Sequence, residues 1–285
     1  MAFGSLKDIL EICKEQKIPF WEAVLLDDLN ERAATREESL QQMQQMWDAM
    51  LLASALYDEK LKSNSGLVGG DGGRMERYLR EEKPLVGSFV SQVIAGALQM
   101  GESNACMKRI VAAPTAGACG VLPAVLVPYA RGENLKTGQV IEALYVSAGI
   151  GQVIASRAFI AGASGGCQAE IGSASAMAAG AMVHLKGGSD HQIVHACAMA
   201  LKNLLGLVCD PVAGLVEVPC VKRNVIGAVN ALAAADMALA GIESRIPPDQ
   251  VIDAMKEVGE LMHVSLKETG RGGLAATPAG QSVVI

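Results

Sequence analysis

Residues 35–61, TREESLQQMQQMWDAMLLASALYDEKL, carry the clearest secondary-structure signal in the chain. Thr35 and Glu38 stand at the spacing of a capping box, in which each side chain binds the backbone N–H of the other residue. The residues that follow at alternating steps of three and four, as on one face of an α-helix, are Leu40, Met43, Trp47, Met50, Ser54, Tyr57 and Leu61. The pattern predicts a long helix that begins at Thr35, with one face covered by this chain or by another.

The composition favours the same secondary structure elsewhere. Ala, Leu, Met and Gln are plentiful and aromatic residues make up only 4% of the chain, so helix is favoured over sheet. A second clear helix is predicted after Pro247 and Pro248. Its apolar side consists of Val251, Ile252, Met255, Val258, Leu261 and Met262. Because no low-complexity linker or fixed-period repeat occurs, we expect a single globular all-α domain, with an N-terminal helical part (1–62) and a part that holds the candidate binding residues (63–285).

Charge and cysteine content narrow the class of protein. The net charge is −6 and no dense run of Lys and Arg occurs, so neither nucleic acid nor anionic lipid is an expected partner. The apolar stretches 141–163 and 225–242 contain Glu142, Arg157 and Asp236, whose charges are costly in lipid, so no membrane span is expected. Seven cysteines and no signal-peptide pattern indicate a reduced, cytoplasmic protein, in which functional thiols are more often metal or redox groups than cross-links.

Short breaks rich in Gly, Ser and Pro separate the predicted helices, and we expect the chemistry there. Backbone N–H groups are free at such breaks, and small residues let a ligand approach the main chain. The sequence contains no Walker P-loop, dinucleotide-binding glycine motif, zinc-protease motif, serine-hydrolase elbow or C-x-x-C pair. The breaks are 63–73, 114–120, 162–166, 187–189 and 210–214. Within the first, residues 69–73 are the candidate hinge.

Three of the seven cysteines, Cys167, Cys209 and Cys220, lie next to irregular segments rather than deep in periodic helices, and the last two stand beside prolines that stiffen the chain. Three thiolates can hold a four-iron cluster and leave one iron open to water or substrate. A buried cysteine can also act simply as a small hydrophobic residue. From the spacing alone, that interpretation stays open for these three. It is the expected one for Cys13, Cys106, Cys119 and Cys197.

Around these cysteines the sequence resembles the alpha subunit of the two-chain bacterial iron–sulfur L-serine dehydratase. The resemblance extends over nearly the whole chain and is most specific around the second and third cysteines. The stretches that carry it are 65–71 (SGLVGGD), 113–117 (APTAG), 165–175 (GGCQAEIGSAS), 204–224 (LLGLVCDPVAGLVEVPCVKRN) and 268–278 (ETGRGGLAATP).

The resemblance implies a helical catalytic subunit that holds a [4Fe–4S] cluster through Cys167, Cys209 and Cys220, on loops and helix ends. It implies the oxygen-sensitive dehydration of L-serine to pyruvate and ammonia, in amino-acid degradation, without pyridoxal phosphate. It also implies a smaller beta subunit as partner, with the possibility of a higher oligomer, and leaves open a monovalent cation. In some single-chain relatives a C-terminal cysteine occupies the open iron. No cysteine follows Cys220 here, so that form is not expected.

Polar turns supply the candidate substrate-binding residues. The turn that begins at Pro114 offers backbone N–H groups and the Thr115 hydroxyl to a substrate carboxylate. Each of these residues could instead serve as a helix cap. The full set is Ser63, Ser65, Gly66, Asn104, Thr115, Gly117 and Lys222.

The general base is the least determined part of the predicted site. The candidate catalytic residues are Thr115, Glu170 and Asp210, and the two carboxylates could equally orient groups around the ligand cysteines. Lys222 and Arg223 are expected to balance the charge of a cluster or to bind the substrate carboxylate. Because no histidine lies in the matching motifs, the beta subunit is the other expected source of the base.

Other functions fit parts of the sequence. A cluster-dependent L-cysteine desulfidase or a related hydroxy-amino-acid lyase would use the same open iron, whereas a non-catalytic helical scaffold would use the cysteines only as core. A pyridoxal phosphate enzyme is disfavoured, because no convincing lysine loop lies beside a phosphate cradle. Two histidines four residues apart are weak evidence for a metal site. We therefore expect an exposed or core-edge trio in His184, His191 and His195.

Overall fold

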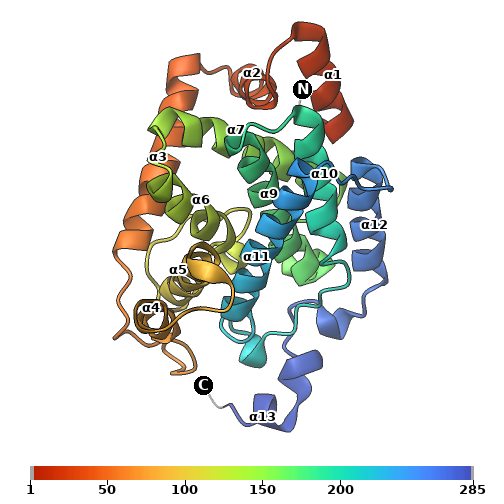
Figure 1. Ribbon diagram of the computed structural model, residues 1–285. Helices are drawn as coiled ribbons and strands as arrows, with labels where there is room; N and C mark the ends of the chain where they lie inside the picture. Colours follow the sequence, from red (N-terminus) through yellow and green to blue (C-terminus); the bar gives the residue numbers. More distant parts are fainter. Residues whose placement is uncertain (1–2, 284–285) are drawn as a thin grey trace.

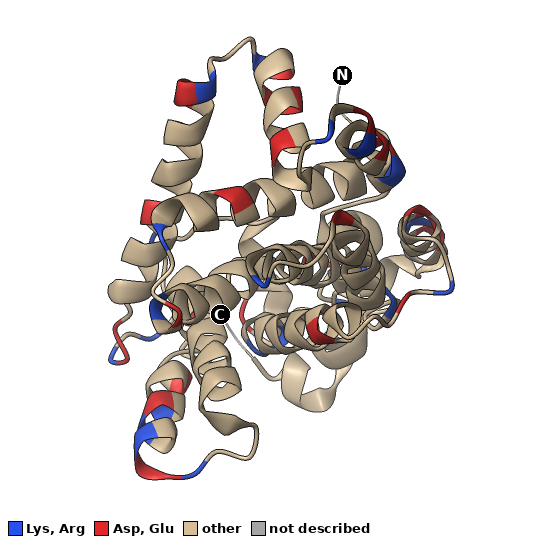
Figure 2. Cartoon of the chain, turned by 45° about the horizontal axis from the view of Figure 1, so that its top comes forward, with Lys and Arg blue, Asp and Glu red and all other residues tan. Residues whose placement is uncertain are grey.

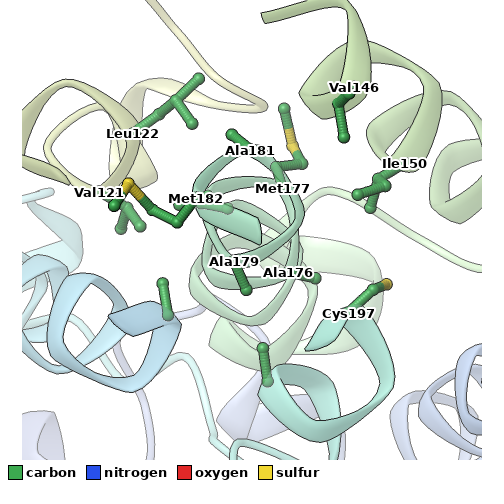
Figure 3. Close-up of a cluster of buried hydrophobic side chains, with 14 of the residues drawn as sticks. Val121, Leu122, Val146, Ile150, Ala176, Met177, Ala179, Ala181, Met182 and Cys197 are labelled. Carbon is green, nitrogen blue, oxygen red and sulfur yellow. The ribbon is translucent and has the colours of Figure 1, made fainter. Parts of the chain in front are cut away.

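A buried helix, α9 (Ser173–Leu185), runs through the centre of the molecule. Every residue from Ser173 to Val183 is buried, and most of them are Ala, Gly or Ser. The helices α6, α7, α10 and α11 pack around it, as Figures 1 and 3 show. A helix that is apolar or small on all sides is the kind that a core encloses. The Ala-rich α9 is therefore the element around which the other helices are organised.

The computed structural model describes residues 3–283, and within this range every regular element is a helix. The predicted all-α, single-domain fold is confirmed (Figure 1). Before the core helix come α1 Leu6–Gln16, α2 Phe20–Arg32, α3 Arg36–Ala55, α4 Asp71–Glu81, α5 Gly87–Ala105, α6 Val121–Gly132, α7 Thr137–Arg157 and α8 Gly162–Gly165. After it come α10 Asp190–Lys202, α11 Cys220–Leu239, α12 Pro248–Leu261 and α13 Pro278–Gln281.

The helix predicted from residue 35 is α3, and its capping box is present. The Thr35 N–H donates to Glu38 Oε2 at 2.8 Å, and the Glu38 N–H donates to Thr35 Oγ1 at 3.2 Å. The predicted continuation to Leu61 is wrong, because α3 ends at Ala55. Tyr57 lies beyond that end, where its hydroxyl donates to the buried Glu102 carboxylate at 2.6 Å, a contact between residues far apart in the sequence.

The second predicted helix is confirmed as α12, which begins at Pro248 and buries Val251, Ile252 and Met255. The two apolar stretches considered as membrane spans are largely α7 and α11, both packed against α9. Among the described helices, none combines the length and apolar character needed to cross a membrane. Figure 2 shows the charged residues mainly on the outer helices and loops.

The C-terminal segment returns to the loop between α10 and α11. Cys209 forms an isolated parallel bridge with Lys267. The Cys209 N–H donates to Leu266 O at 2.8 Å, and the Glu268 N–H donates to Cys209 O at 2.7 Å. Two segments about 60 residues apart are thus fixed to each other at one of the predicted ligand cysteines.

The capping box makes a testable contribution to stability. Replacing Thr35 by Ala removes the side-chain acceptor for the Glu38 N–H, so the free energy of unfolding is expected to fall by about 0.5–2 kcal/mol. Urea denaturation measures the change, with the exposed Gln44→Ala on the same helix as the control. Equal stability of Thr35→Ala and Gln44→Ala would show that the capping box does not stabilise α3.

Candidate active site

Three different local structures present the predicted ligand cysteines. Cys167 precedes a π-helical turn, η2 (Gln168–Gly172), that leads directly into α9. Cys209 lies in the extended segment bonded to the C-terminal region, and Cys220 is the first residue of α11. Their exposed fractions are 2%, 2% and 6%. The structure thus places all three thiols at loops and helix ends, and π-helical turns of this kind are frequent at functional sites.

The thiols lie close enough to influence each other's ionisation. The ligand atoms of Cys167, Cys209 and Glu170 all lie within 4.8 Å of one another. Interaction with the Cys209 thiol, opposed by burial and assisted by the charge of Arg223, lowers the pKa of Cys167. Burial, followed by the negative charges of Cys167 and Glu170, raises the pKa of Cys220 to about 12. Cys167 is therefore the thiol of the group that ionises most readily.

Arg223 brings positive charge to the thiols. Its Nη1 donates to Cys167 Sγ at 3.4 Å and to Val208 O at 2.7 Å. Its Nη2 lies 2.8 Å from Asp210 Oδ1, and the other oxygen of Asp210 accepts the Leu274 N–H at 2.8 Å. Asp210 is only 3% exposed. Because both its oxygens are engaged, Asp210 is placed to position Arg223 and the C-terminal segment.

Glu170 lies between the thiols and the Thr115 turn. The Thr115 hydroxyl donates to Glu170 Oε1 at 2.6 Å. A Cβ at Gly117 or Gly162 would come within 3.0 Å of this carboxylate, and at Gly162 it would also come 2.9 Å from Cys209 Sγ. Burial raises the pKa of Glu170, opposed by the Thr115 hydrogen bond. The structure thus brings together Thr115, Gly117 and Glu170, which the sequence analysis selected separately.

Asn224, which the sequence analysis did not single out, ties the Thr115 turn to a predicted ligand cysteine, Cys220. Its Nδ2 donates to Gly117 O at 2.9 Å and to Cys220 O at 3.0 Å. Its Oδ1 accepts the Gly120 N–H at 2.8 Å, and the residue is 1% exposed. The only sequence signal was an amide directly after Arg223, near the start of a predominantly apolar segment.

The two serines of the 63–68 turn bind a carboxylate that the sequence analysis also missed. The Ser63 and Ser65 hydroxyls donate to Glu217 Oε2 at 2.8 and 2.5 Å. Glu217 is 7% exposed and stands three residues before Cys220. Its signal in the sequence was a lone charge within the apolar run 211–221.

The remaining predicted substrate-binding residues lie in different surroundings. Asn104 Nδ2 donates to Ala116 O at 3.2 Å, so this side chain is beside the Thr115 turn. Gly66 has a φ of 77° in the turn of the two serines. Lys222 is exposed and its Nζ lies 3.2 Å from Asp71 Oδ2, so its placement does not support the predicted substrate contact.

The histidines do not form one group. His184 on α9 lies 3.5 Å from Glu142, whereas His191 and His195 on α10 meet through their Nε2 atoms at 3.2 Å. His195 Nδ1 accepts the Ser244 N–H at 3.0 Å, so the proton of a neutral ring is on Nε2. That nitrogen then lacks the lone pair that a metal needs.

The chain is similar to proteins of one known family. A family model described as serine dehydratase alpha chain matches residues 15–275. The chain belongs to the serine dehydratase alpha-chain family. The three thiols, Arg223 and the Thr115 turn all lie within the matched range.

Individual relatives match nearly the whole length of the chain. It is 47% identical over 281 residues to the probable L-serine dehydratase, alpha chain, of Bacillus subtilis, spanning 99% of this chain and 94% of that protein. It is 42% identical over 281 residues to the L-serine dehydratase, alpha chain, of Peptoniphilus asaccharolyticus, spanning 98% and 96%. The L-serine dehydratase of Helicobacter pylori is 36% identical over 283 residues, which are 96% of this chain but 62% of that longer protein.

Asn224 gives a direct test of how the site is held together. Replacing it by Ala leaves buried backbone groups at Gly117, Gly120 and Cys220 without their partner, so the free energy of unfolding is expected to fall by about 1–3 kcal/mol. Urea denaturation measures this, with the exposed Asn203→Ala as the control. A loss no larger than that of the control would contradict the bridging role.

Proposed function

We propose that the chain is the catalytic subunit of an L-serine dehydratase, which eliminates water from L-serine and yields pyruvate and ammonia. The observation that carries the proposal is the convergence of three buried thiols, Arg223 and Glu170 in one place. Membership of the serine dehydratase alpha-chain family supports it, as do relatives named L-serine dehydratase. A scaffold that used cysteines only as core would have no need of a half-buried arginine and a buried carboxylate beside them.

The donor set fits a [4Fe–4S] cluster held by Cys167, Cys209 and Cys220. Thiolates are the ligands that iron–sulfur clusters take in proteins. Arg223, 3.4 Å from Cys167 Sγ, offsets the negative charge that three thiolates would bring. Glycine at 162 keeps the chain from filling the space beside Cys209 Sγ. When bound, such a cluster supplies a Lewis acid that makes a hydroxyl a better leaving group, at the iron without a protein thiolate.

The chain's own groups would orient the substrate and move its proton. The Thr115 turn is proposed to bind the substrate carboxylate, with Asn104 holding the turn through Ala116 O. Glu170 is the buried carboxylate nearest to the thiols, and the Thr115 hydroxyl fixes its Oε1 at 2.6 Å. Glu170 is therefore the group in this chain proposed to accept the α-proton of serine. The product enamine hydrolyses to pyruvate and ammonia.

We further propose that the active protein pairs this chain with a smaller beta chain in the cytoplasm. The names of the Bacillus and Peptoniphilus relatives specify an alpha chain, which implies a partner. The Helicobacter relative is a single longer protein in which the matched residues are 62% of the length. We propose that the rest of that longer protein corresponds to the beta chain, which is a separate chain here.

Cluster binding is tested by removing two ligands at once. The double variant Cys209→Ser, Cys220→Ser, purified without oxygen, is expected to lose iron, sulfide and the visible absorbance of thiolate-bound iron, since two thiolate ligands are gone. The control is Cys13→Ala, which removes a buried thiol from the hydrophobic core. This variant should keep its iron, its sulfide and its visible absorbance. Iron retained by the double variant would rule out these two cysteines as ligands.

The role of Glu170 is tested by Glu170→Gln, which keeps the shape of the side chain and removes its basicity. The kcat for pyruvate formation from L-serine, assayed with the beta chain, is expected to fall by roughly 10²–10⁴-fold, the usual contribution of a general base. Iron content measured on the same preparation should not change. Unchanged kcat would place the base on the partner chain. Hydrogen sulfide from L-cysteine with no pyruvate from L-serine would instead identify a desulfidase.

A further inference from the structure

Glu217 is a buried carboxylate without a cationic partner. It is 7% exposed, and among residues 3–283 no Lys, Arg or His forms an ion pair with it. Buried charges are normally paired, because desolvation of an unpaired one is costly. The hydrogen bonds that Ser63 and Ser65 donate to its carboxylate both end on Oε2. Within the described chain, Oε1 has no hydrogen-bond donor.

The hydroxyl protons of Ser63 and Ser65 are both engaged in hydrogen bonds to Glu217. Each hydroxyl carries a single hydrogen, and those of Ser63 and Ser65 point to Glu217 Oε2 at 2.8 and 2.5 Å. Each oxygen also accepts a backbone N–H, from Val68 at 3.3 Å and from Leu67 at 3.1 Å. The atoms that remain available to a ligand are Glu217 Oε1 and the two hydroxyl oxygens, and all of them accept hydrogen bonds. This turn therefore suits a cation and has no hydroxyl proton to donate to a carboxylate.

This group of acceptors adjoins the thiol site. The Glu217 carbonyl accepts the Val221 N–H at 3.0 Å. Glu217 therefore lies one helical turn before Val221, which directly follows Cys220. Val68, which ends the serine turn, packs against Val221 in a small buried cluster. The turn and the first ligand-bearing turn of α11 are thus in direct contact.

We propose that Glu217, with the hydroxyl oxygens of Ser63 and Ser65, binds the α-ammonium group of the amino-acid substrate. This inference rests on the proposed function and adds to it the basis of selectivity for amino acids over hydroxy acids. It divides the recognition of serine between two turns. The ammonium is bound at the 63–68 turn, and the carboxylate is bound at the Thr115 turn.

The test compares ligands with and without an ammonium group on the enzyme reconstituted without oxygen and assayed with its beta chain. In Glu217→Gln, the KM of L-serine is expected to rise roughly 10- to 100-fold, as for the loss of a charge-assisted hydrogen bond. The inhibition constant of 3-hydroxypropionate, which is serine without its amino group, should stay unchanged. Iron content is measured on every preparation and should match that of the wild type.

Asp28→Asn is the matched control. Asp28 also accepts a serine hydroxyl, that of Ser39 at 2.5 Å, but lies on α2 in an ion pair with Arg32. This variant should leave both constants at wild-type values. If Glu217→Gln does not fold, Glu217→Asp retracts the carboxylate by one methylene and is expected to raise the KM of serine with the same selectivity.

Two outcomes would overturn the inference. Equal shifts of both constants in Glu217→Gln, or no shift in either, would mean that Glu217 does not recognise the ammonium. If the wild-type enzyme nevertheless binds iron and makes pyruvate from L-serine, the proposed function holds and only the ammonium site is wrong. Wild-type enzyme that makes no pyruvate from L-serine removes the proposed function, and the ammonium site with it.

Discussion

The site depends on a local excess of buried acceptors over cations. The site buries three thiols together with the carboxylates of Glu170, Asp210 and Glu217. Among the described residues, Arg223 is the cation that lies beside the Cys167 thiol and the Asp210 carboxylate. Groups of this kind are costly to bury without compensation. A fold that retains them has a use for positive charge from outside, which we propose is cluster iron beside the thiols and the substrate ammonium beside Glu217.

The helical core makes this arrangement rigid. The small residues of α9 let four helices approach it closely (Figure 3). The proposed ligand Cys167 precedes the π-helical turn that leads into α9, and the proposed ligand Cys220 is the first residue of α11. Two side chains then fix the loops to those helix ends. Asn224 holds the Thr115 turn against Cys220, and Asp210 holds Arg223 and the C-terminal segment. The groups that would bind substrate are therefore positioned before it arrives, which limits the reorganisation needed for catalysis.

Local sequence signals predicted much of the fold. The capping box at Thr35 and the paired prolines at the start of α12 identified where two helices begin. The Gly- and Pro-rich breaks identified the loops beside the proposed ligands Cys167 and Cys209. The end of α3 was not predictable in this way, because Tyr57 lies beyond the helix and its hydroxyl binds Glu102, 45 residues away in the sequence. Asn224 and Glu217 were missed for the same reason. Their partners lie 107 and 154 residues away, and only the packed structure brings them together.

The central claim is that three thiolates hold a cluster whose remaining iron is open to the substrate. Mössbauer spectroscopy of protein loaded with ⁵⁷Fe under anaerobic conditions tests it directly, with and without L-serine. The expected spectrum is that of a four-iron cluster in which one iron differs from the other three and its signal shifts when L-serine is added. Protein that binds no iron, or a cluster in which L-serine alters none of the four irons, would contradict it.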